Sequence, residues 1–362
     1  MRIEDINIKQ VLTKDLQKTA EVEIKTRKGT VHSIAPLNKN GIYRIRSLPT
    51  EELTRKFLEI KRHFVNQAFN DIHELDIFLH DIDISIDFRE IGGNLTFAIS
   101  SAFLKAFAKW EGIRIYEYLL KKRPELPVPL CIVTDKEKTS IDFKELLLYP
   151  VQQKIFSKSI MKLVSVYNGL KFDNNLTNDK ILKILAALTT KNSLEIGINL
   201  GATDIWNDRK YVYSTGESLT TQEQLGLVQD IATNYPVGYI EDPFHEDDFV
   251  LSATLKHRLP TRLVVGNELY SNNFERFKHG VELKSTSGIN ITPTQIGTIT
   301  DVMNMVKEAK KHKIATIVSC GIDDSLISNL AVGLGFDYIK LGVDSASINR
   351  MNELIRIENK II

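Results

Sequence analysis

The sequence contains only two cysteines, Cys131 and Cys320, which lie far apart and outside any CxxC spacing. Disulfide frameworks and thiolate zinc sites both need several cysteines at short or regular spacings. The scarcity of cysteine therefore excludes both kinds of site, and it favours the reducing cytoplasm as the compartment in which the protein works.

Long apolar runs and an excess of one charge are also lacking. No run of about 18 apolar residues occurs, so no segment is expected to span a membrane. The opening MRIEDINIKQ alternates charged residues with isoleucine and has no apolar stretch typical of a signal peptide. The 47 Lys and Arg balance 46 Asp and Glu, for a formal net charge of +1. Because binding to phosphate groups relies on a local excess of basic residues, neither nucleic acid nor a membrane is an expected partner.

The first part of the chain changes from strand-like to helix-like patterning. Apolar and polar residues alternate over 20–26, and a Gly-Thr turn leads into a second such run at 31–35, which predicts an antiparallel hairpin. From Thr50, apolar residues recur three or four positions apart, and the Thr50 hydroxyl is a candidate helix cap. Further helices are predicted over 94–110 and 115–120. Strands followed by helices predict an α+β domain over residues 1–125.

After this domain, short apolar runs alternate with amphipathic stretches. Eight such runs occur, at 129–133, 146–151, 194–200, 237–240, 262–265, 288–291, 315–319 and 338–341. Eight buried strands with helices between most of them fit a closed β/α barrel over residues 126–362, although an open doubly wound sheet would give the same pattern. Neither GxGxxG nor GxxxxGK[ST] follows any run, which excludes the common glycine-rich phosphate loops.

One segment is far more specific than the rest. Residues 239–249 read YIEDPFHEDDF, so that a strand-like run leads into Glu-Asp-Pro-Phe and an acidic helix start. This segment resembles the metal-ligand segment of the enolases. Other strings resemble enolase strings in the same order: TAEVE at 19–23, SIAP at 33–36, PVP at 127–129, VGNEL at 265–269, QIGT at 295–298, YIK at 338–340 and NELIRIE at 352–358. The resemblance covers nearly the whole chain.

The resemblance implies the enolase fold, which is of the α/β class. An N-terminal α+β capping domain, here residues 1–125, is followed by an eight-stranded β/α barrel, here residues 126–362, with the active site at the carboxyl ends of the strands. Enolases interconvert 2-phosphoglycerate and phosphoenolpyruvate. A lysine removes the proton alpha to a carboxylate, a glutamate helps the hydroxyl to leave, and magnesium stabilises the dianionic intermediate. This chemistry needs cations beside the developing enolate charge, in a site that excludes water.

The positions that match the three metal-ligating carboxylates are only partly acidic. The resemblance places these ligands at Asn199, Glu241 and Asn267, with an acidic neighbour of the third kept as Glu268. Two amides in place of carboxylates change the ligand charge from about −3 to about −1, and magnesium is normally held by carboxylates, often together with substrate oxygens. We therefore expect a possible Mg2+ site of much weakened affinity.

Most other positions of the matched site are also changed. The base lysine falls on Thr292, and the Gly-Asp-Glu-Gly-Gly loop that carries the proton-donating glutamate is missing between residues 169 and 194. The family's Ser-His-Arg-Ser string reads SCGI at 319–322, so its histidine and its phosphate-binding arginine are absent. The serine loop over the substrate reads PLNKNG at 36–41, without the serine. Five or six losses together indicate a repurposed site.

Two charged residues of the matched site are retained, Glu145 and Lys340, and they are the candidate catalytic residues. The alternative for Lys340 is an ion pair with Glu145 or Glu241, because a lysine at a strand end pairs with a carboxylate more often than it acts as a base. Glu241 likewise either ligates a cation with Asn199 and Asn267 or accepts hydrogen bonds from Lys340 or backbone amides.

The two cysteines have different expected roles. Cys320 ends an apolar run before Gly321 and a predicted helix, a placement that suits either a reactive thiolate or a small buried residue. No clear histidine partner accompanies it, which favours the second interpretation. Cys131 lies within a predicted strand and is expected to be part of the core.

These replacements favour an enolase-family paralogue that has lost enolase chemistry, a pseudoenzyme that keeps the scaffold for a binding or assembly role. The alternative is a divergent lyase of the phosphopyruvate hydratase type, acting on 2-phosphoglycerate or a related carboxylate. A small carboxylate or phosphate is the candidate ligand. In enolases, a glutamate and an arginine that match Glu21 and Arg356 pair across the dimer interface, so the resemblance implies a homodimer.

Overall fold

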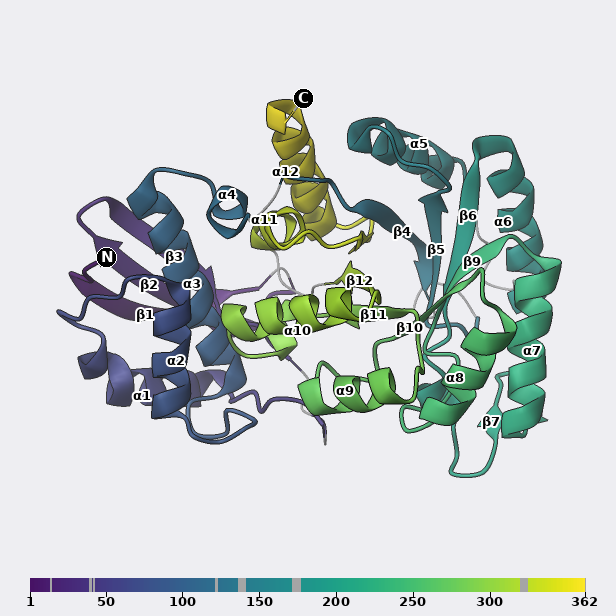
Figure 1. Cartoon of the computed structure of the whole chain (residues 1–362), viewed down its shortest axis with the longest axis horizontal. Helices are drawn as coiled ribbons and strands as arrows, with labels where there is room; N and C mark the ends of the chain where they lie inside the picture. The colour runs from purple at the N-terminus through teal and green to yellow at the C-terminus, as the bar shows by residue number, and fades with distance from the viewer. Residues whose placement is uncertain are drawn as a thin grey trace. The chain divides into compact units, whose positions relative to one another are not determined.

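The computed structural model describes residues 1–361 apart from 14, 39–40, 42, 121–122, 136–140, 171–176 and 320–324. The chain divides into two compact units, which are described separately (Figure 1). The first unit comprises Met1–Glu125, Thr292–Glu308 and Val318–Gly335, and the second comprises Leu126–Ile291, Ala309–Ile317 and Phe336–Ile362. The domain limits 1–125 and 126–362 stay a prediction of the sequence.

The first unit contains a three-stranded antiparallel sheet of β1 (Asp5–Leu12), β2 (Lys18–Thr26) and β3 (Gly29–Ile34). Strands β2 and β3 form the predicted hairpin, in which Ile24 lies opposite Val31. Gly29 has a φ of +114°, a conformation that glycine adopts without the steric cost of a side chain. Strand β1, which the sequence analysis did not identify, pairs along its whole length with β2.

Helices α1 (Thr50–Ile60) and α3 (Gly93–Glu111) pack against this sheet. The other helices that fall wholly or largely in this unit are η1 (Lys61–His63), α2 (Ile72–Ile82), α4 (Ile115–Leu119), η3 (Pro293–Gln295), α10 (Ile299–Lys311) and α11 (Leu326–Gly333). Helix α1 begins where it was predicted, but its predicted cap was wrong. The Thr50 hydroxyl donates to the Lys18 carbonyl at 2.8 Å, because β2 supplies a nearer acceptor, and Pro49 occupies the N-cap position.

Eight strands form a closed barrel in the order β10-β11-β12-β13-β4-β5-β6-β9. They are β4 (Val128–Asp135), β5 (Glu145–Pro150), β6 (Leu194–Asn199), β9 (Val237–Glu241), β10 (Leu263–Gly266), β11 (Gly288–Ile291), β12 (Ala315–Val318) and β13 (Tyr338–Leu341). Each corresponds to a predicted run, and the closed barrel rules out the doubly wound sheet. Strand β5 runs antiparallel to both of its neighbours, because the connection from Asp135 to Glu145 is too short for a helical crossover.

The second unit also contains helices and a small hairpin outside the barrel. These elements are α5 (Phe156–Gly169), α6 (Asn178–Asn192), η2 (Ala202–Ile205), β7 (Tyr211–Val212), β8 (Ser218–Leu219), α7 (Thr221–Asn234), α8 (Phe249–Arg258), α9 (Phe274–Glu282) and α12 (Ser345–Ile361). Helices α6 and α7 lie beside β6 and β9 (Figure 1). The buried Glu358 of α12 accepts hydrogen bonds from the Phe156 and Ser157 N–H groups at the start of α5. Its charge satisfies these free donors and interacts favourably with the helix dipole.

Apolar side chains fill the barrel below its carboxyl end. Six buried residues form one cluster, Leu130, Leu147, Tyr149, Tyr239, Val265 and Ile317. A larger cluster, which includes Cys131 with 1% of its surface exposed, packs outside the strands, as expected for a core cysteine. Among the described residues, no helix is long and apolar enough to cross a membrane.

The first unit buries a carboxyl group, Asp76 of α2. It accepts hydrogen bonds from the Ser100 hydroxyl of α3 at 2.6 Å and from the Thr300 N–H of α10 at 2.8 Å. Burial raises the pKa of Asp76 from 3.8 to about 7, although these hydrogen bonds oppose the change. The Asp76 carboxyl group therefore links helices α2, α3 and α10, and its burial disfavours loss of its proton.

We predict that Asp76→Asn flattens the pH dependence of stability. The folded chain keeps this proton up to about pH 7, whereas the unfolded chain loses it near 3.8, so the stabilisation is fully present below 3.8 and falls as pH rises toward 7. The substitution should remove a slope of up to about 1.4 kcal/mol per pH unit. Urea unfolding between pH 4 and pH 8 measures this, with the exposed Asp81→Asn as the control. Equal slopes in the wild type and Asp76→Asn would contradict it.

Candidate functional site

The carboxyl end of the barrel brings together side chains from five strands. Glu241 is the last residue of β9, Asn199 is the last of β6, and Lys340 and Asn290 lie near the ends of β13 and β11. Glu145 is the first residue of β5, and because β5 is antiparallel, its start lies at the same end of the barrel. The register pairs Glu145 with Asn199 and Asn199 with Glu241. These five residues are called the barrel-end cluster.

Lys340 contacts both carboxylates of this cluster. Its Nζ bonds to Glu145 Oε2 and lies 2.8 Å from Glu241 Oε2, and only 5% of the lysine side chain is exposed. Burial would lower the pKa of Lys340, but the charges of Glu145 and Glu241 outweigh this effect and raise it. Burial would likewise raise the pKa of Glu145, but Lys340 and the Asn199 amide hold it below its ordinary value. Lys340 is therefore a protonated ion-pair partner in this arrangement, and a general base must be unprotonated.

Glu241 is fully buried and each of its oxygens has two donors. Oε1 accepts from Asn290 Nδ2 at 2.9 Å and from Asn199 Nδ2 at 3.3 Å. Oε2 accepts from the Tyr239 hydroxyl and from Lys340. A carboxylate offers about four lone-pair sites, and here protein donors face all of them.

Asn199 is oriented as a hydrogen-bond donor toward the carboxylates. Its Oδ1 accepts from the Gly201 N–H at 3.1 Å, and its Nδ2 donates to Glu145 at 2.9 Å and to Glu241. Because a backbone N–H can only donate, the oxygen must face Gly201 and the nitrogen must face the carboxylates. An amide binds a metal ion through its oxygen, so the metal-ligating atom of Asn199 points elsewhere.

The third predicted ligand position, Asn267, belongs to a separate set of contacts. The Asn267 and Glu268 N–H groups donate to the Asp242 carboxylate at 2.8 and 3.0 Å. Asp242 has a φ of +44°, a left-handed conformation that aspartate tolerates better than most residues. Within the described residues, the Asn267 side chain forms no hydrogen bond.

A second, partly buried ion pair joins Lys144 to Glu268. Burial would lower the pKa of Lys144, but the Glu268 charge outweighs this effect and raises it. Burial, with the nearby charges of Glu268 and Glu241, raises the pKa of Asp242 to about 8. The carboxyl end of the barrel thus holds two lysines that are both paired within the protein.

Sequence reasoning missed four members of these contacts, which are Tyr239, Asn290, Lys144 and Asp242. Alternation along a strand could have found the first two, because Tyr239 lies two residues before Glu241 and Asn290 two before Thr292. Thr292, at the matched position of the base lysine, has its hydroxyl 3.0 Å from that of Ser319. Cys320 and the rest of the matched SCGI string lie outside the described residues, as do Lys39 and Asn40 of the matched serine loop.

The described residues do not fit a magnesium ion. They contain no group of three or more His, Cys, Asp or Glu side chains that could hold a metal. Both oxygens of Glu241 accept hydrogen bonds from protein donors, and Asn199 directs its amide nitrogen rather than its oxygen toward them. Magnesium demands octahedral oxygen ligands, and it loses its water shell reluctantly, so this donor set cannot replace that shell.

Comparison with known families decides the ancestry. Residues 173–362, more than half of the chain, match the family model described as enolase, C-terminal TIM barrel domain. The chain belongs to the enolase family. The resemblance drawn from the EDPF segment and the ordered strings is therefore confirmed.

Relatives named enolase are similar along nearly the whole chain. The enolase of Methanosphaera stadtmanae is 28% identical over 403 residues, which cover 99% of this chain and 97% of that protein. Enolases of Saccharolobus islandicus and Saccharolobus solfataricus are 26% and 25% identical over 375 residues, which cover 92% of this chain and 86% of each relative. The chain is thus a divergent member of the enolase family.

We predict that Lys340→Met destabilises the protein by about 3–5 kcal/mol, because it leaves the fully buried Glu241 and the partly buried Glu145 without their shared cation. The double variant Lys340→Met/Glu241→Gln should recover part of the loss. Urea unfolding at pH 7 measures both. Lys183→Met, which breaks an exposed ion pair with Asp179, serves as the control and should cost much less stability than Lys340→Met. Equal losses for the two lysines would contradict the importance of the buried pairs.

Proposed function

We propose that this enolase-family protein does not catalyse the enolase reaction and that its barrel serves a binding or assembly role. The observation that carries the proposal is the saturation of Glu241, whose two oxygens face Asn199, Asn290, Tyr239 and Lys340. A metal would have to displace at least one of these donors from a fully buried site, and each displaced donor would lose its partner there.

Charge supports the same proposal. Transition-state stabilisation needs positive charge that is free to meet the developing anion. Both lysines that the structure describes at the barrel end are already paired, Lys340 with Glu145 and Glu241, and Lys144 with Glu268. Little positive potential is therefore left for a phosphorylated dianion, and Thr292 offers a hydroxyl where the family's base lysine is matched.

The rival function is a divergent lyase that acts on 2-phosphoglycerate or a related carboxylate. One observation favours it, since Glu145 and Lys340 are retained and in contact, and 22% of the Glu145 side chain is exposed. A ligand that reached Glu145 could exchange a proton with this pair. The two functions differ in turnover, which can be measured directly.

We predict no turnover of 2-phosphoglycerate with millimolar magnesium, measured as the absence of a rise in phosphoenolpyruvate absorbance. An active enolase under the same conditions is the positive control. A rate near the typical enzyme value of about 10 s⁻¹ would overturn the proposal.

Magnesium titration by calorimetry completes this test. The wild type should show no saturable heat, whereas Asn199→Asp/Asn267→Asp, which restores the two matched carboxylates, should gain magnesium binding and magnesium-dependent thermal stability. Tight magnesium binding by the wild type would contradict the proposal and would favour a metal-dependent enzyme.

We also propose a homodimer in which Glu21 of one protomer pairs with Arg356 of the other. Arg356 lies on α12 with 64% of its side chain exposed, and its partner within the chain is Glu353 at 3.2 Å. Glu21 lies on β2, where its carboxylate is 3.3 Å from His32 Nδ1 and 22% exposed. Both groups are thus accessible to another chain, and a two-fold axis would form the pair twice.

We predict that Arg356→Glu weakens dimerisation and that adding Glu21→Arg partly restores it, because the double change reverses both charges. Sedimentation velocity over a range of concentrations measures the association. Arg55→Glu is a matched control, since Arg55 is equally exposed and also pairs with a neighbouring glutamate on its own helix. Unchanged sedimentation of Arg356→Glu would refute the pairing.

A further inference from the structure

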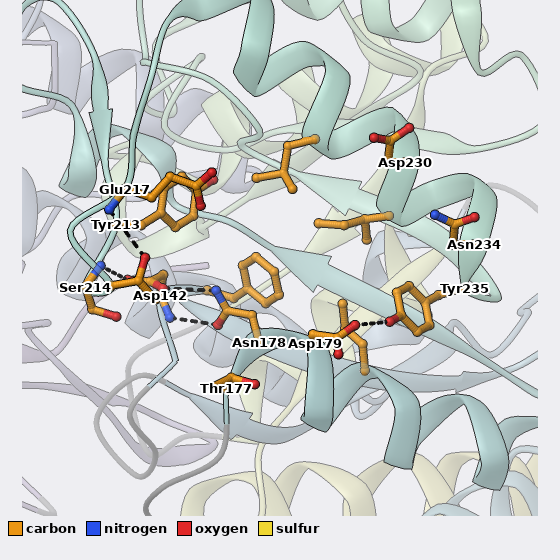
Figure 2. A pocket seen from close by; sticks show the side chains of 15 residues that line it. Asp142, Thr177, Asn178, Asp179, Tyr213, Ser214, Glu217, Asp230, Asn234 and Tyr235 are labelled. Carbon is orange, nitrogen blue, oxygen red and sulfur yellow. Dashed lines mark hydrogen bonds between the residues drawn. The ribbon is translucent and has the colours of Figure 1, made fainter.

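A second site in the barrel-containing unit shares no residue with the barrel-end cluster. It is a cavity of about 580 Å³. Its walls come from the start of α6, from the second half of α7, from Asp142 and Phe143 before β5, and from the β7–β8 turn (Figure 2). This volume falls within the range of about 300–1,000 Å³ that small-molecule sites occupy.

The floor of the cavity is apolar. Phe143 and Leu182 are each 2% exposed, and Leu227 and Ile231 of α7 are partly buried against the same core. The buried Tyr213 is held in place by its hydroxyl, which donates to Gln224 at 2.7 Å. The cavity therefore offers a rigid hydrophobic surface to a ligand.

Four carboxylates line the cavity, and among the described residues no lysine, arginine or histidine lines it. Two of the four are held by the protein. Asp142 accepts from the Asn178 amide at 2.9 Å and from the Ser214 N–H at 2.7 Å, and Asp179 accepts from the Tyr235 hydroxyl at 2.5 Å and from Lys183 at 2.6 Å. The lysine keeps the pKa of Asp179 below its ordinary value.

The other two carboxylates, Glu217 and Asp230, are available to a ligand. Within the described residues, neither accepts a hydrogen bond or forms an ion pair. In Figure 2, Glu217 lies on one side and Asp230 on the other, with hydrophobic side chains drawn between them. A concave surface lined by charge of one sign concentrates ions of the opposite sign, so the cavity attracts cations and repels anions.

We propose that this cavity binds a small organic cation, in which an amine or amidine is attached to an apolar body. The apolar body would lie on Phe143, Leu182 and Leu227, and the cation would meet Glu217 or Asp230. Charge complementarity carries the assignment, because an anion would face Glu217 and Asp230, which no described cation pairs with. The inference does not rest on the function proposed for the barrel-end cluster.

The size of the cavity favours a small molecule over a basic protein segment. A stable protein interface buries about 800 Å² on each partner, whereas a cavity of this volume encloses a ligand of drug-like size. A charge-assisted hydrogen bond from the ammonium group to a carboxylate would fix the orientation of the ligand.

The test compares three probes on the full chain that share an indole ring and a two-carbon arm, namely tryptamine, indole-3-propionamide and indole-3-propionate. Ligand-observed NMR at low ionic strength should give saturable tryptamine binding with a dissociation constant below about 1 mM. The amide should bind at least threefold more weakly, and the carboxylate should not bind. No saturation by tryptamine up to about 10 mM, or equal binding of all three probes, would overturn the proposal.

Variants at the two available carboxylates locate the site. Glu217→Gln and Asp230→Asn should each weaken tryptamine binding about three- to tenfold, and the double variant should abolish it. Asp208→Asn, an exposed carboxylate outside the cavity, is the matched control and should bind like the wild type, while unchanged thermal unfolding confirms that the variants fold. Unaltered binding by the double variant would overturn the assignment. Trilysine represents a basic protein segment, and tighter binding of trilysine than of tryptamine would also overturn it.

Discussion

Lys340 neutralises two carboxylates at the carboxyl end of the barrel, and the other contacts of the site are arranged around this buried charge. Three strands contribute to the ion pairs, since Glu145 begins β5, Glu241 ends β9 and Lys340 lies on β13. Two buried acids without this cation would carry a large desolvation cost. The amides of Asn199 and Asn290 and the hydroxyl of Tyr239 complete the shell by donating to the same acids.

This arrangement gives a physical reason for the amide at Asn199, where the resemblance predicts a carboxylate. A third acid at Asn199 would lie against Glu145 and Glu241 and would need a divalent cation to balance it. An amide adds no charge and donates to both neighbours, so the site is stable on its own.

The two regions of the barrel-containing unit differ in the charges that they leave available. At the barrel end, the described lysines and the two acids of the network are matched to one another. In the cavity beside α6 and α7, Glu217 and Asp230 remain unmatched over an apolar floor. The described charges of the network at the barrel end are thus paired, whereas the cavity presents unpaired negative charge.

Much of the architecture follows from local patterning. The eight apolar runs became the eight barrel strands because a strand that is buried on both faces must be apolar throughout, and that signal is local.

Strand β1 and helix α2 were missed. In β1 the sequence DINIKQVL alternates only weakly, and only Ile6 is fully buried there. The Thr50 cap failed because its competing acceptor, Lys18, lies 32 residues earlier in the chain.

The sequence by itself determined the family, because the EDPF segment and the ordered strings are local properties of the chain. The replaced positions Asn199, Asn267 and Thr292 stay a prediction from the resemblance. Only the tertiary structure decided what Glu241 does. Its four donors come from positions 199, 239, 290 and 340, which lie on four strands, and their geometry depends on barrel closure and strand register. The same carboxylate can serve as a metal ligand or as a hydrogen-bond acceptor. Which of the two it is depends on the atoms that the fold places around it.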